Sequence, residues 1–151
     1  LAIDAIENKT MPCGYEVTTH GGRKKTNIDV LKWAKKGVKN GAGEILLTSM
    51  NSDGTKKGYN LKLTKIISKN VSVPVIASGG AGSPMDMVEV VLKAGASAVL
   101  AASIFHYGIH SISSVKKEMS KSGIQIRDCE FWNEWSDYKR VIPFVKKKKN
   151  K

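Results

Sequence analysis

The residues best suited to chemistry follow short apolar runs of the chain. Asp4 comes directly after Leu-Ala-Ile, where a carboxylate at the end of a buried strand can act as a general acid or base. Its alternative role is to cap a loop or to pair with a lysine. Asp53 stands in Ser-Asp-Gly, which is also a common turn sequence. Both aspartates are candidate site residues, and the pattern alone leaves a structural role open for each.

A glycine-rich segment, Ser-Gly-Gly-Ala-Gly at 78–82, follows another apolar run and precedes a helical pattern. Glycines let backbone N–H groups approach an anion closely, and the N-terminus of a following helix favours negative charge. The alternative is a tight turn that needs positive φ angles. The segment therefore predicts a phosphate site, with the simple turn as the competing interpretation.

The remaining reactive side chains give weaker signals. His20, His106 and His110 lack the spacing of a metal-binding motif, and we expect them to be loop residues. Cys13 and Cys129 are far apart, which favours free thiols in a reducing cytoplasm over a disulfide. We therefore expect neither a metal nor a cofactor.

Four apolar runs of strand length alternate with amphipathic helical patterns. The runs occupy residues 1–5, 45–50, 73–78 and 98–104. The last three are almost continuously apolar, which is typical of strands buried on both faces of a parallel sheet. Ser83-Pro84 and Asp86 form a helix start signal, as does the segment 26–29. Gly41, Gly95 and Gly123 are placed where these helices should end.

A weak internal repeat relates residues 41–50 to residues 95–104, two strand–helix units further on, so one unit has about 27 residues. The segment 11–22 interrupts the pattern, and we expect it to form a short hairpin inserted after the first strand. Residues 1–127 are thus predicted to form four βα units of an α/β protein, half of a (β/α)8 barrel. The active site of such a barrel lies at the carboxyl ends of its strands.

Length and charge set further bounds. The chain has 151 residues, whereas a complete (β/α)8 barrel typically needs ~250. It also starts at Leu1 inside a predicted strand, so we expect a truncated barrel. The net charge of +12 allows a nucleic-acid partner, but interleaved acids favour solvated helix faces and an anionic substrate. No apolar run approaches ~20 residues and no signal peptide is visible, which predicts a cytoplasmic protein without membrane contact.

Residues 128–151 depart from the βα pattern. They hold Phe131, Trp132, Trp135 and Tyr138, followed by a lysine run at 146–149. We expect a C-terminal extension, whose structure the sequence does not determine.

Five segments together resemble the cyclase subunit of imidazole glycerol phosphate synthase. They are Leu-Ala-Ile-Asp-Ala (1–5), Thr-His-Gly-Gly-Arg-Lys (19–24), Gly-Ala-Gly-Glu-Ile-Leu-Leu-Thr-Ser-Met-Asn-Ser-Asp-Gly-Thr (41–55), Pro-Val-Ile-Ala-Ser-Gly-Gly-Ala-Gly (74–82) and Ala-Ala-Ser-Ile-Phe-His (101–106). The resemblance covers about residues 1–127 and corresponds to strands five to eight, the C-terminal half of that barrel. It implies a lyase of histidine biosynthesis, in a heterodimer with a glutaminase that docks at the amino-terminal face of the barrel.

The resemblance also implies a reaction and roles for residues. Ammonia from the glutaminase converts a doubly phosphorylated phosphoribulosyl-formimino ribonucleotide to imidazole glycerol phosphate and an aminoimidazole carboxamide ribonucleotide. Asp4 matches the catalytic aspartate of strand five, and its strand-one partner would precede Leu1. Thr48, Asp53 and Ser78 match residues that line the substrate pocket. The phosphate-binding matches are Gly54, Gly79, Gly80, Ala102 and Ser103.

Two departures and three alternatives remain. Many family members have Lys where this chain has Ile6, and the segment after Arg127 matches nothing in the family. The phosphoribosyl isomerase of the same pathway shares the half-barrel plan, but Thr-Ser-Met at 48–50 and Thr-His-Gly-Gly-Arg favour the cyclase. A stand-alone half barrel that binds phosphate, without catalysis and as a self-dimer, is the second alternative. The third is a nucleic-acid binder that uses the basic end of the chain.

Overall fold

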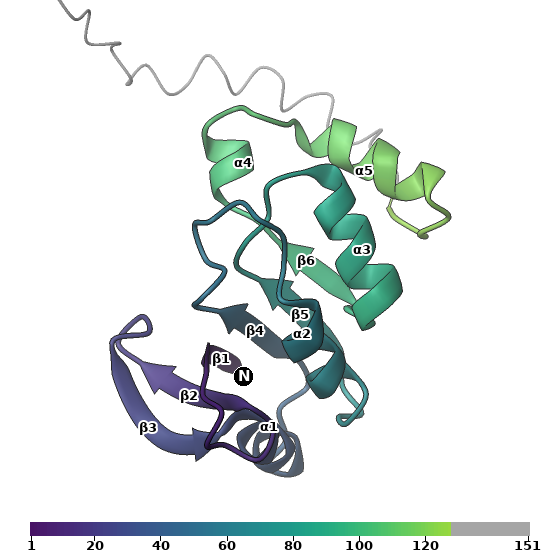
Figure 1. Ribbon diagram of the computed structural model, residues 1–151. Helices are drawn as coiled ribbons and strands as arrows, with labels where there is room; N and C mark the ends of the chain where they lie inside the picture. Colours follow the sequence, from purple (N-terminus) through teal and green to yellow (C-terminus); the bar gives the residue numbers. More distant parts are fainter. Residues whose placement is uncertain (128–151) are drawn as a thin grey trace, which may run out of the picture.

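A computed structural model describes residues 1–127, which form one six-stranded sheet with helices packed on one face (Figure 1). The strand order is β3-β2-β1-β4-β5-β6. Four strands are parallel neighbours: β1 (Ala2–Glu7), β4 (Ile45–Ser49), β5 (Val75–Ser78) and β6 (Ala98–Leu100). They coincide with the four predicted apolar runs, and connecting helices separate them in the chain. The predicted half-barrel architecture is therefore confirmed.

A hairpin of β2 (Tyr15–Thr19) and β3 (Lys24–Asp29) extends the sheet beyond β1 with antiparallel pairing. The prediction placed this hairpin at 11–22, but its second strand extends to Asp29; the helix start predicted at 26–29 falls at the last residue of that segment. Residues 24–29 pair with β2, so the helix cap is Asp29, whose side chain accepts a hydrogen bond from the Lys32 amide. The missed strand, Lys-Lys-Thr-Asn-Ile-Asp at 24–29, is polar and has no buried residue, so it lacks the apolar alternation that marks a strand.

The connecting helices are α1 (Val30–Lys39), α2 (Leu61–Ser68), α3 (Pro84–Ala94), α4 (Ser103–His106) and α5 (Ile112–Lys121). Gly95 ends α3 in a left-handed conformation, as its position predicted. The fourth strand was predicted over 98–104 but ends at Leu100, because Ser103 and the buried Ile104 already belong to α4. None of the helices within the described range is long and apolar enough to cross a bilayer.

The two faces of the parallel strands differ in burial. Alternate residues, among them Ile3, Leu47 and Ala77, are fully buried against the helices. The intervening residues point to the other face, where Leu46 and Ile76 are only half-buried and Leu100 is 43% exposed. This second face would be the interior of a closed barrel, and within residues 1–127 no helix covers it.

A buried carboxylate organises the hairpin. The Glu16 side chain on β2 is fully buried and accepts hydrogen bonds from the Asn27 amide and from the Asn8 side chain, each at 2.7 Å. Asn27 has a φ of 59°, a left-handed conformation that asparagine tolerates better than most residues. The Asn27 amide and then the Asn8 side chain lower the pKa of Glu16. Glu16 therefore joins the loop after β1 to the far strand of the hairpin.

Replacing Glu16 should reduce stability in a pH-dependent manner. The pKa of Glu16 in the folded chain lies below its usual value in the unfolded chain. The ionised side chain therefore contributes fully to the free energy of unfolding above the usual pKa, and this contribution is lost as the pH falls through the folded-state pKa. We expect Glu16→Gln to lower the urea midpoint at pH 7, and the difference from the parent chain to narrow at about pH 3.5. Glu44→Gln, at an exposed position, is the control. An equal deficit at both pH values would contradict this role.

Candidate functional site

The register of the parallel strands aligns polar side chains at their carboxyl ends. Asp4 on β1 pairs with Thr48 on β4, Thr48 pairs with Ser78 on β5, and Ser78 pairs with Leu100 on β6. Residues in register on a parallel sheet project from the same face. Asp4, Thr48 and Ser78 are half-buried and therefore form one row on the face that the helices leave open. Three predicted site residues from distant parts of the sequence are thus brought together.

A pocket of about 50 Å³ lies at the ends of β5 and β6. Its walls are the segment after β4, the glycine-rich turn after β5, and the β6–α4 connection. The lining residues are Asp53, Gly54, Lys56, Ser78, Gly79, Gly80, Ala81, Leu100, Ala101, Ala102 and Ser103. Seven of the nine predicted site residues are among them. Asp4 and Thr48 lie outside the pocket, along the same strand-end row as Ser78.

The turn after β5 requires glycine for two reasons. Gly79 and Gly80 have φ angles of 88° and 105°, which other residues rarely adopt. A Cβ atom on Gly80 would also collide with the backbone of Gly58, whose amide donates a 2.8 Å hydrogen bond to the Gly80 carbonyl. The backbone of the glycine-rich segment therefore forms the tight turn with positive φ angles that the sequence offered as one interpretation. The same turn gives the pocket a wall without side chains, so a ligand could contact the main chain.

Backbone donors gather around this pocket. Within residues 1–127, the amides of Gly54, Gly80, Ala102 and Ser103 have no protein acceptor. Gly80 is buried, Ser103 is half-buried, and Gly54 and Ala102 are exposed, so these four amides are free to donate to an oxygen-rich anion at the pocket. The four amides belong to three separate segments. Only the folded arrangement of β4, β5 and β6 places them around one space.

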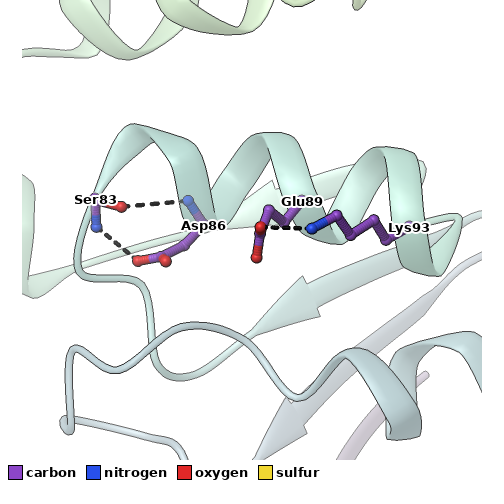
Figure 2. A network of polar contacts seen from close by, with 4 residues as sticks. All are labelled: Ser83, Asp86, Glu89 and Lys93. Carbon is purple, nitrogen blue, oxygen red and sulfur yellow. Dashed lines mark hydrogen bonds and ion pairs between the residues drawn. The ribbon is translucent and has the colours of Figure 1, made fainter.

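The N-terminus of α3 does not contribute in the way that the sequence suggested. The two amides just before the helix are bound by its own carboxylate, since Gly82 and Ser83 donate to Asp86 Oδ2 at 2.9 and 2.8 Å. Asp86 in turn donates its amide to Ser83 Oγ at 3.3 Å, which completes a capping box (Figure 2). Glu89 and Lys93 form an ion pair one to two turns further along the same helix. The amides of Gly82, Ser83 and Asp86 therefore have partners within this capping box.

Two further residues near the pocket were missed by the sequence analysis. Lys56 lines the pocket, and the buried Tyr59 donates its hydroxyl to the Leu100 carbonyl at 3.0 Å. Burial raises the pKa of Tyr59, and the charge of Asp86 acts in the same direction, so the hydroxyl stays protonated. It ties the segment after β4 to the end of β6. The only signal in the sequence was their proximity to Asp53 and Gly54.

The other candidates stay apart from the pocket. His20, His106 and His110 do not line it, and His20 lies in the hairpin turn with a φ of 56°. Cys13 is a half-buried free thiol, and Cys129 lies outside the described residues together with the predicted extension 128–151. In the part of the chain that the structure describes, no three histidine, cysteine or acidic side chains are grouped as metal ligands.

Fold and site together define a class: half of a (β/α)8 barrel with a small pocket at the carboxyl ends of its strands. A model of the family described as histidine biosynthesis proteins matches residues 1–111, and the chain belongs to this family. It is also similar to the imidazole glycerol phosphate synthase subunit HisF of Bacillus subtilis (strain 168), with 58% identity over 127 residues, 84% of this chain. The chain spans about half the length of this relative, since the match covers 50% of it.

The close contact between the two loops predicts unequal costs for two glycine substitutions. Gly14→Ala places a Cβ at a φ of 83° in open space, so it should cost about 1–2 kcal/mol of conformational strain alone. Gly80→Ala adds a collision with backbone atoms, which cannot rotate away, and we expect a loss of about 3 kcal/mol or more. Urea denaturation of both variants measures the difference. Equal losses would show that the loops are not in close contact.

Proposed function

We propose that this chain supplies half of the active site of an imidazole glycerol phosphate synthase cyclase, and that its pocket holds one substrate phosphate. One observation carries the proposal: four unpaired amides line a pocket next to a row of polar strand-end residues. A phosphate offers several acceptor oxygens in a compact tetrahedron, which matches donors that converge from three segments. Family membership and the similarity to HisF support the same assignment.

In this proposal Asp4 is the general acid or base for the ring-forming and bond-cleaving steps. Its position two strands away from Ser78 leaves space for the body of the substrate along the open face. Thr48 and Ser78 lie in register with Asp4 and would contact the substrate between the carboxylate and the bound phosphate. Asp53 lines the phosphate pocket itself. Each group thus contacts a different part of one extended ligand.

Turnover requires more than this chain provides. The open face of the sheet leaves Asp4 without an opposing wall among the described residues, and paired acid–base groups are needed to move protons in both directions. We propose that four complementary βα units supply the second aspartate and the second phosphate site. The further partner in this proposal is a glutaminase that provides ammonia, and a cytoplasmic location stays a prediction.

The phosphoribosyl isomerase reaction is the alternative within the same fold. The half-barrel geometry suits either reaction, because both need a strand-end aspartate and a phosphate site. The similarity to HisF favours the cyclase. Activity measured with each substrate on one completed barrel would separate the two.

Substituting Asp4 should abolish most of the turnover. We suggest co-expressing this chain with the complementary half of the B. subtilis relative and measuring ammonia-dependent cyclisation. Asp4→Asn keeps the size of the side chain but cannot exchange a proton, so turnover should fall by ~10²–10⁴-fold while substrate affinity is largely kept. The control is Glu7→Gln, an exposed side chain at the end of the same strand.

Near-normal turnover of the Asp4→Asn barrel would show that Asp4 is not catalytic. A completed barrel that binds phosphate but turns over neither substrate would favour the non-catalytic phosphate-binding module instead.

A further inference from the structure

Lys56 is the only basic side chain among the residues that line the pocket, within the described part of the chain. We propose that its ammonium group is the cation that neutralises the bound phosphate, and that it moves to the phosphate from a resting position over Tyr107. This inference rests on the phosphate pocket proposed above. It concerns a different question, namely which charge makes the pocket bind a dianion.

The backbone of Lys56 is held in an unusual conformation. Its φ of 56° lies in the left-handed region, which is costly for a residue with a Cβ and persists only where surrounding contacts impose it. Those contacts are visible on both sides. The Lys56 carbonyl lies against Gly82, where a Cβ would collide with it, and Gly58 is hydrogen-bonded to Gly80. The segment after β4 is thus seated on the glycine-rich turn, and Lys56 is fixed at the rim of the pocket.

The side chain of Lys56 extends toward the opposite wall. Its Nζ lies 5.3 Å from the centroid of the Tyr107 ring, within the range of a cation–π contact. Tyr107 directly follows α4, and its amide donates to the Ser103 carbonyl at 3.0 Å. Lys56 therefore bridges the segment after β4 and the segment that carries Ala102 and Ser103, the two sides between which a phosphate would lie.

The contact with Tyr107 is weak enough to be exchanged. The Tyr107 side chain is 76% exposed, and cation–π contacts at exposed sites contribute little. A hydrogen bond between an ammonium group and a phosphate oxygen is charged on both sides and is stronger. Tyr107 thus keeps the cation near the pocket without competing effectively with a bound dianion.

The charge of Lys56 matters for anion binding because the pocket lining also contains a carboxylate. Asp53 lines the same pocket and its carboxylate opposes the binding of an anion. Lys56 offsets that charge, whereas without it the lining would carry a carboxylate alone. Unpaired amides then still donate hydrogen bonds, but a dianion would meet a net negative site. We therefore expect the affinity for phosphate to depend strongly on this one lysine.

The first test uses the complete 151-residue chain and inorganic phosphate as the probe. Titration followed by NMR should show an affinity about tenfold lower for Lys56→Met than for the parent chain. Lys57→Met is the matched control, since it removes the same charge one residue away and Lys57 does not line the pocket. Its affinity should change less than about twofold, because an exposed charge outside the pocket is screened by solvent and salt.

A second variant separates binding from folding. Lys56→Gly removes the strain of the left-handed backbone, so the chain should resist urea at least as well as the parent while it binds phosphate about tenfold more weakly. A purely structural role for Lys56 would not shift stability and affinity in opposite directions. The Lys56 ε-methylene signals should also carry a ring-current shift from Tyr107 that phosphate removes.

The outcomes are distinct. If the parent chain does not bind inorganic phosphate, the phosphate pocket of the proposed function fails, and the role of Lys56 fails with it. If the parent chain binds but Lys56→Met and Lys57→Met bind equally well, the pocket stands and the role of Lys56 is overturned. Phosphate binding without a change in the ε-methylene signals would overturn the movement away from Tyr107.

Discussion

The register of four parallel strands is the constraint on which the candidate site depends. Side chains alternate between the two faces of a strand. If one strand shifted its pairing register by one residue, its polar residue (Asp4, Thr48 or Ser78) would therefore point toward the helices. Burial of the neighbouring residues, such as Leu47 and Ala77, makes that slip costly. The apolar core therefore fixes the positions of the polar residues at the strand ends, although it does not touch any ligand.

A second constraint is the contact between the segment after β4 and the turn after β5. Gly80 and Gly58 approach so closely that neither loop could move without the other. This contact holds the segment with Gly54 beside the turn with Gly80, while Tyr59 holds the end of β6 against the same segment. The pocket is thus a consequence of the way these segments pack.

The sequence predicted what local patterns encode and missed what tertiary contacts decide. Short, almost continuous apolar runs were sufficient to locate the four parallel strands, and the cap of α3 could be assigned from Ser83 and Asp86. The hairpin bounds failed because β3 is polar and shows no apolar alternation, and the fourth strand was overextended because Ile104 is apolar in either state. The position of Lys56 could not be predicted in this way. It depends on a left-handed backbone conformation that is held by contact with the glycine-rich turn, more than 20 residues further along the chain.

The two parts of the site differ in how complete they are. Residues from one chain surround the anion pocket, with walls from the segments after β4, β5 and β6. Asp4 instead lies on the face of the sheet that the described residues leave uncovered, the face that also carries the half-buried Leu46 and Ile76. Within residues 1–127, this face of the sheet has no opposing wall that could carry a second acid–base group. Anion binding and acid–base chemistry should therefore be separable in this chain: the first needs only the described fold, and the second needs a wall across the open face.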